Sequence, residues 1–175
     1  GKGVRILNSA DLTAGALQAL GNGIFQPRLS PHPMLNEFGS DALPTLRIGT
    51  VITPAGVPEI RCCYLKIGRP GQSVILASNQ VRVAIDWKTG EAAPVGYLAD
   101  WTPVTAPPGN TLVFSGVVVP FVKDAAETAV TLHGQMPLPG YVCWDFAIDQ
   151  FGAVRLLEWE GGVVSFAEAA QGPCF

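Results

Sequence analysis

Apolar and polar side chains alternate with a period of two in several short segments of this chain, which is the pattern of β-strands. Turns rich in Gly and Pro separate the alternating segments, and this favours hairpins over long crossover connections. The pattern predicts strands at residues 4–7, 24–26, 45–52, 57–67, 73–77, 81–86, 141–149 and 154–159. Residues 100–110, which are rich in Pro and Thr, are predicted to form a loop.

Helical periodicity is expected in two segments. The first helix is predicted to begin at Ser9 as N-cap and to stop at Gly21. The second begins at Pro120, a favoured first helical residue, and runs to about His133, with Gly134 behind it. Strands outnumber helices and most connections are short. The predicted fold class is therefore α+β, with a mostly antiparallel sheet and helices packed against it.

Composition narrows the classes of function without naming one. The chain has 175 residues, of which 48% are hydrophobic and only 14% charged, and this length predicts one domain with a sizeable core. Its net charge of −3 argues against a nucleic-acid partner, since such binding needs a basic surface. No apolar run reaches the roughly 18–20 residues of a membrane span, so we expect no membrane span and a cytoplasmic location.

The four cysteines lack the spacing of a zinc site. Cys62 and Cys63 are adjacent on a predicted strand, so their side chains should point to opposite faces of the sheet. Together with Cys143 and Cys174 they are interpreted as small buried hydrophobic side chains.

Three acidic residues on the last predicted hairpin are the most informative candidates. Glu158 and Glu160 share one face of their strand, and the hairpin can bring Asp145 opposite them. Three carboxylates on one face repel each other unless a cation lies between them, and hard oxygen ligands suit magnesium carried with nucleotide phosphates. The alternative is three solvated charges on an exposed sheet face, and spacing alone favours this alternative.

Residues 141–160 resemble the closing motif of ATP-grasp enzymes, in which an Asp on one strand and a Glu-x-Asn on the next bind magnesium. The run Trp-Asp-Phe-Ala-Ile at 144–148 resembles the sugar-transfer-associated ATP-grasp family in particular. Other segments are similar in order: residues 1–4 to the glycine-rich phosphate loop, 25–33 to the hinge strand beside adenine, and 45–48 to the strand whose Arg faces the phosphates.

The resemblance implies that residues 1–175 are the C-terminal large lobe of an ATP-grasp enzyme, mostly antiparallel sheet with packed helices. The chain would begin inside the glycine-rich loop, and we expect its parent protein to supply the small lobe and the domain before it. ATP and Mg²⁺ are the implied cofactors. The implied reaction phosphorylates an unknown substrate carboxylate, and an amine or related nucleophile then attacks the acyl phosphate. The family's name suggests cell-surface polysaccharide or peptide biosynthesis.

The resemblance also assigns roles residue by residue. Catalytic phosphate contacts fall to Arg47 and Lys66, nucleotide contacts to Lys2, Gln26, His32 and Arg69, and magnesium to Asp145, Glu158 and Glu160. Plainer roles stay open for several of them: a surface charge for Arg47, solvated strand ends for Lys66 and Arg69, a structural turn for His32 and a solvated chain start for Lys2.

Two departures from the family pattern support a different class of function. Glu160 stands where the motif has Asn, and residues 78–82 replace a loop that carries a diglycine in the family. The alternative is therefore a degenerate, non-catalytic ATP-grasp-like domain with a binding or scaffolding role.

Overall fold

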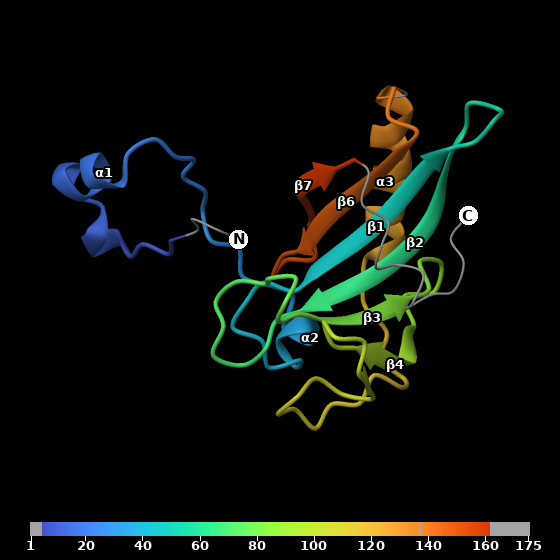
Figure 1. The fold of residues 1–175 in the computed structure, drawn as a ribbon, viewed down its shortest axis with the longest axis horizontal. Helices are drawn as coiled ribbons and strands as arrows, with labels where there is room; N and C mark the ends of the chain where they lie inside the picture. The colour runs from blue at the N-terminus through green and yellow to red at the C-terminus, as the bar shows by residue number, and fades with distance from the viewer. Residues whose placement is uncertain (1–4, 137, 162–175) are drawn as a thin grey trace.

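Residues 5–136 and 138–161 are described by a computed structural model, and within them a seven-stranded sheet has the order β5-β4-β3-β2-β1-β6-β7 (Figure 1). Every neighbouring pair of strands is antiparallel, which confirms the predicted α+β class. The strands are β1 (Thr45–Ile52), β2 (Pro58–Ile67), β3 (Val81–Ile85), β4 (Ala92–Tyr97), β5 (Pro103–Val104), β6 (Tyr141–Ile148) and β7 (Val154–Glu160). The helices are a 3₁₀ turn (Ser9–Asp11), α1 (Ala14–Leu20), α2 (Pro33–Asn36) and α3 (Val122–Gln135).

One face of the sheet is apolar and carries helix α3, which Figure 1 shows lying along it. Cross-strand partners share a face, so the pairs Leu46–Phe146 and Ile48–Trp144 of β1 and β6 line this side together. The buried side of α3 is mostly alanine, and small side chains let the helix approach the strands closely. This layer is the hydrophobic core, and it forces the other half of each alternating strand onto the opposite face.

The opposite face of the sheet is polar even where it is buried. Arg47 of β1 pairs with Tyr64 of β2 and with Asp145 of β6, and Lys66 of β2 pairs with Arg82 of β3. All five residues therefore lie on one face, across four neighbouring strands. Their concentration there makes this face the place to search for function.

The cysteine interpretation holds for the residues that the structure describes. Cys62, Cys63 and Cys143 are buried, and Cys62 and Cys63 lie on opposite faces of β2, because Cys63 joins the core under α3 and Cys62 contacts Tyr64. Cys174 lies outside the described residues.

Three predicted strands are wrong where the structure describes them. Residues 5–7, 24–26 and 73–77 form no strand. Ile24 and Phe25 are 89% and 59% exposed, so the apolar run around them has no neighbouring strand to pair with. Residues 73–77 end in a turn that Asn79 closes on Leu76 through a side-chain and a backbone hydrogen bond. Local alternation cannot supply a hydrogen-bonded neighbour, and a strand needs one.

Strand β4 was not predicted, because its Pro94 and Gly96 read as turn residues. The β1–β2 hairpin is confirmed, with β2 beginning at Pro58, one residue later than expected, and β6 and β7 also match their predicted positions within one residue.

Both predicted helices exist with shifted ends. Helix α1 begins after Thr13, whose hydroxyl accepts a hydrogen bond from the backbone of Ala16, while Ser9 starts only the 3₁₀ turn. Helix α3 begins at Val122, because Phe121 adopts a left-handed conformation. Helix α1 buries no residue and projects away from the sheet in Figure 1. Among the described residues, no helix combines the length and the apolar character that a membrane crossing requires.

Candidate functional site

The centre of the polar face is an ion pair between neighbouring strands. Arg47 and Asp145 are direct cross-strand partners in β1 and β6. Nε and Nη2 of Arg47 donate to Oδ1 and Oδ2 of Asp145 at 2.7 and 2.8 Å, a two-pronged geometry that suits the planar guanidinium. The Asp145 side chain is only 3% exposed, so this carboxylate depends on protein partners rather than on water.

A second cation reaches the same carboxylate from β2. Lys66 is the cross-strand partner of Thr45 in β1, and its Nζ donates to Oδ2 of Asp145 at 2.5 Å. The ammonium therefore crosses over β1 to meet a residue on the strand beyond it. This contact places the two residues predicted to bind phosphate, Arg47 and Lys66, side by side on one carboxylate.

Burial and charge act against each other on these groups. Burial alone would raise the pKa of Asp145, but the hydrogen bonds from Arg47 and the charge of Lys66 outweigh it and hold that pKa below its ordinary value. Burial lowers the pKa of Lys66 despite the neighbouring carboxylate. Burial would also lower the pKa of Arg47, but its contacts with Asp145 outweigh burial and hold that pKa above its ordinary value. The guanidinium therefore stays charged.

The two glutamates of β7 lie on the same face, as the alternation predicts. Glu158 is the direct cross-strand partner of Asp145, and Glu160 is the partner of Cys143. Oε1 of Glu160 accepts a hydrogen bond from Nη1 of Arg47 at 2.5 Å. Trp159, between the glutamates, points to the other face, where its ring lies 6.4 Å from that of Trp144.

Two residues of this face were missed by the sequence reading. Tyr64 and Arg82 are 4% and 1% exposed, and the Arg82 guanidinium lies 4.6 Å from the ring centre of Trp101. The signal was present: Tyr64 lies two residues before Lys66, and Arg82 is the only charged residue of β3. Their presence extends the cationic, aromatic character of the face toward β3.

The predicted nucleotide contacts are scattered relative to this cluster. Lys2 lies outside the described residues, and Gln26 is exposed in a segment without regular secondary structure. Nδ1 of His32 accepts a hydrogen bond from the backbone of Met34 and caps α2. Arg69 follows β2, and among the described residues its buried Nε finds no hydrogen-bond acceptor. Their roles in nucleotide binding stay predictions.

The strand that carries Asp145 is anchored from below by a buried polar network. Nε1 of Trp144 donates to Oγ1 of Thr50 at 2.7 Å, and the same oxygen lies 2.7 Å from Nδ1 of His133 on α3. Nε2 of His133 in turn lies 2.8 Å from the carbonyl oxygen of Pro139. The network therefore joins β1, β6 and α3 on the face of the sheet opposite the ion pair.

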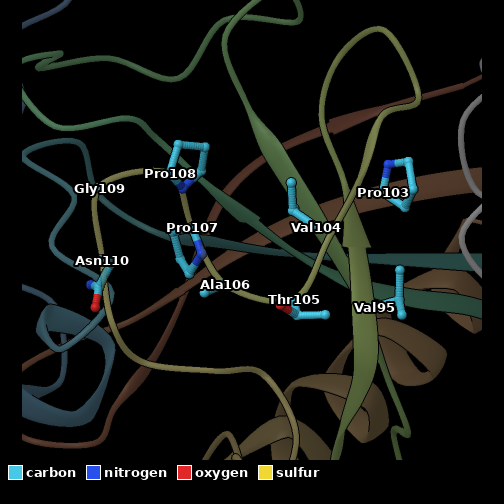
Figure 2. Close-up of a pocket in the computed structure, with 9 residues that line it drawn as sticks. All are labelled: Val95, Pro103, Val104, Thr105, Ala106, Pro107, Pro108, Gly109 and Asn110. Atoms are coloured by element: carbon cyan, nitrogen blue, oxygen red, sulfur yellow. The ribbon is translucent and has the colours of Figure 1, made fainter.

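A pocket of about 580 Å³ lies elsewhere, at the β4–β5 end of the sheet (Figure 2). It is lined by Val95 and residues 103–110, whose prolines and glycine give it a largely apolar wall. Among the residues that the structure describes, those that line the pocket include no charged side chain and none of the predicted site residues. It therefore offers no counter-charge to an anion, and the polar face of the sheet remains the candidate site.

One protein family is similar to this chain over most of its length. The model of one protein family, described as sugar-transfer associated ATP-grasp, matches residues 14–170, which is most of the chain. The chain belongs to this family. A comparison with curated proteins finds no match. ATP-grasp domains bind ATP, so family membership supports nucleotide binding by this ATP-grasp chain.

The donor set of the polar face fits magnesium in its chemistry, because Asp145, Glu158 and Glu160 bring carboxylate oxygens to one face. Their arrangement is different from a formed metal site. Within the described residues, no three acidic, cysteine or histidine side chains are gathered closely enough to hold an ion. Instead, the Arg47 guanidinium lies between Asp145 and Glu160.

Proposed function

We propose that this chain is the ATP-binding large lobe of an ATP-grasp ligase that activates a carboxylate as an acyl phosphate. The observation that carries the proposal is the meeting of Arg47 and Lys66 over one buried carboxylate on the polar face. The side chains of Arg47 and Lys66 are 14% and 12% exposed. A ligand can therefore reach them from solvent, and their burial strengthens the attraction between their charges and an anion.

The reaction that we propose has two steps. An oxygen of the substrate carboxylate attacks the γ-phosphorus of ATP, the bond from that phosphorus to the β–γ bridging oxygen breaks, and ADP leaves. An amine or related nucleophile then attacks the acyl carbon, the bond from that carbon to the phosphate oxygen breaks, and inorganic phosphate leaves together with the proton that the nucleophile loses. In the first step negative charge develops on the phosphoryl and bridging oxygens, where the positive charges of Arg47 and Lys66 would stabilise it.

Asp145, Glu158 and Glu160 are the residues that would hold magnesium in this proposal. When bound, the ion would supply positive charge to the β- and γ-phosphate oxygens. The chain's own contribution is to keep Asp145 ionised at neutral pH, because its partners hold the pKa of that carboxyl low. Sugar-linked carboxylates are the substrates that we propose from the family's description, with peptide-linked carboxylates as the alternative.

A second candidate is a nucleotide-binding domain without catalysis. It is favoured by the engagement of Asp145 and Glu160 with Arg47, which leaves two of the three acidic residues already neutralised. The two candidates differ in one observable property, which is the formation of ADP.

The test begins with ATP binding, measured by calorimetry at millimolar nucleotide with and without Mg²⁺. Lys66→Met removes one phosphate-facing cation, and Lys123→Met, an exposed lysine on α3, is the matched control. A charge-assisted hydrogen bond contributes about 1.5–3 kcal/mol, so Lys66→Met should weaken ATP binding by roughly 10- to 150-fold. The control should stay within about twofold of the wild type. Absence of ATP binding, or equal losses in both variants, contradicts the proposal.

Catalysis is tested on the full-length parent protein, with the expected small lobe present, by adding hydroxylamine, which converts an acyl phosphate into a hydroxamate, together with a panel of sugar and peptide carboxylic acids. ADP and hydroxamate formed in equal amounts support the ligase. ATP binding without ADP formation supports the second candidate.

A further inference from the structure

The Arg47 guanidinium occupies the space between two carboxylates that the proposed function assigns to a metal ion. Its three nitrogens are all engaged: Nε and Nη2 by Asp145, and Nη1 by Glu160. The side chain is mostly buried, so water screens these contacts weakly. One planar cation on β1 therefore joins a carboxylate of β6 to a carboxylate of β7.

Charge balance explains why a divalent ion gains little at this place. Arg47 and Lys66 contribute two positive charges, and Asp145 and Glu160 contribute two negative charges. The cluster of four is neutral, and a further cation would meet two positive charges beside the oxygens that it needs. Glu158, the third predicted ligand, is exposed on the edge strand, and its negative charge acts to raise the pKa of Lys66.

Glu160 has a specific part in this arrangement. An asparagine, which the resembled motif has at this position, carries no charge and could not form an ion pair with Nη1 of Arg47. The glutamate of this chain therefore adds the second carboxylate that holds the guanidinium in the bridging position.

We propose that Arg47 is an internal competitor of the divalent cation. In the nucleotide-free protein it holds Asp145 and Glu160 and keeps magnesium affinity low. Phosphate oxygens offer the guanidinium an equivalent partner, so arrival of a polyphosphate frees the carboxylates for the cation. The polyphosphate half of this inference rests on the proposed function, whereas the competition for the carboxylates does not.

The experiment titrates Mg²⁺ into the nucleotide-free protein and records binding by calorimetry and the shift of the melting temperature. Arg47→Gln removes the competitor, and Arg61→Gln is the matched control, because Arg61 is an exposed arginine on β2 that pairs with Glu59 at 3.2 Å. We expect Arg47→Gln to bind Mg²⁺ at least about tenfold more tightly than the wild type, since it loses three charge-assisted hydrogen bonds from the ligands. Arg61→Gln should match the wild type.

A double variant assigns the new affinity to this place. Arg47→Gln combined with Asp145→Asn should lose the gain in Mg²⁺ affinity, because the central ligand has become a neutral amide. An undiminished gain in the double variant would mean that the ion binds elsewhere, and the inference would be overturned. Equal Mg²⁺ affinity in the wild type and Arg47→Gln would overturn it directly.

If Arg47→Gln does not fold, Arg47→Lys decides the question. Lysine keeps the positive charge, but its single ammonium cannot bridge both carboxylates as the planar fork does. Arg47→Lys should therefore bind Mg²⁺ more tightly than the wild type, and an unchanged affinity counts against the inference. These titrations contain no nucleotide, so a failure to bind ATP removes the proposed function and leaves the competition between Arg47 and Mg²⁺ intact.

Discussion

The hydroxyl of Thr50 should contribute far more to stability than its size suggests. Thr50 is fully buried, and its Oγ1 accepts a hydrogen bond from Nε1 of Trp144 at 2.7 Å. Because Nε2 of His133 faces a carbonyl oxygen, it carries the proton, and Nδ1 then accepts from the Thr50 hydroxyl at 2.7 Å. Thr50→Val keeps the shape of the side chain but removes the hydroxyl, so Nε1 of Trp144 and Nδ1 of His133 both lose their partner.

The magnitude follows from the two groups left unmatched. A buried donor or acceptor that loses its partner costs about 1–3 kcal/mol, so Thr50→Val should lower the free energy of unfolding by roughly 2–6 kcal/mol. For a domain of this length the melting temperature falls about 2–4 °C for each kcal/mol, which predicts a fall of roughly 4–24 °C. The substitution should weaken the packing of α3 against β6, the strand that carries Asp145.

Urea unfolding at equilibrium measures this difference, with an unchanged dependence on urea as the sign that only stability has changed. Thr128→Val is the matched control, because Thr128 is exposed on α3 and its hydroxyl donates to the carbonyl of Asp124 at 2.7 Å. The control should change stability by no more than about 0.5 kcal/mol. Equal effects of the two substitutions would refute the assignment of the network as a buried anchor.

Two further predictions concern charge and backbone. The folded pKa of Asp145 lies below its unfolded value of about 3.9, so the stability that its carboxylate contributes is present above about pH 4 and is lost as pH falls toward the folded pKa. Urea unfolding between about pH 5 and pH 2 should therefore show a shallower acid loss for Asp145→Asn than for the wild type, and parallel curves would contradict this. Gly90→Ala combines a φ of +80° with a Cβ 2.4 Å from the carbonyl oxygen of Val119, whereas Gly56→Ala has a φ of +77° in open space. Both variants should lose about 1–2 kcal/mol of unfolding free energy to backbone strain. Gly90→Ala should lose at least about 1 kcal/mol more, as measured by thermal unfolding, because its Cβ clashes with Val119. Equal losses in the two variants would show that this clash does not affect stability.

Local pattern was enough for the elements whose signal is contained in neighbouring residues. The hairpin of β6 and β7 was predicted because alternation and a tight turn lie within about twenty residues of each other, and the same pattern placed Glu158 and Glu160 on one face. The β1–β2 hairpin follows for the same reason. Burial of Cys62 and Cys63 on opposite faces needed only the period of the strand.

Local pattern failed where an element depends on what lies beside it. The run around Phe25 has strand-forming residues and no strand to pair with, so it stays exposed. Strand β4 has Pro94 and Gly96 in its middle and still forms, because the backbone of β3 supplies partners for Gly96 and Tyr97. Hydrogen bonds between strands are made over distances in the chain that local periodicity does not cover.

The sequence by itself determined which residues can face a ligand, and the tertiary structure decided what they touch. Alternation puts Arg47, Lys66 and Asp145 on particular sides of their strands, and nothing in that pattern says which strands are neighbours. The pairing of β1 with β6 brings together Arg47 and Asp145, which are 98 residues apart in the chain. The same pairing lets Lys66, 79 residues from Asp145, reach the same carboxylate. A charge buried on a sheet must find its partner on the next strand or the one beyond it, and strand order is set by how the whole core packs under α3.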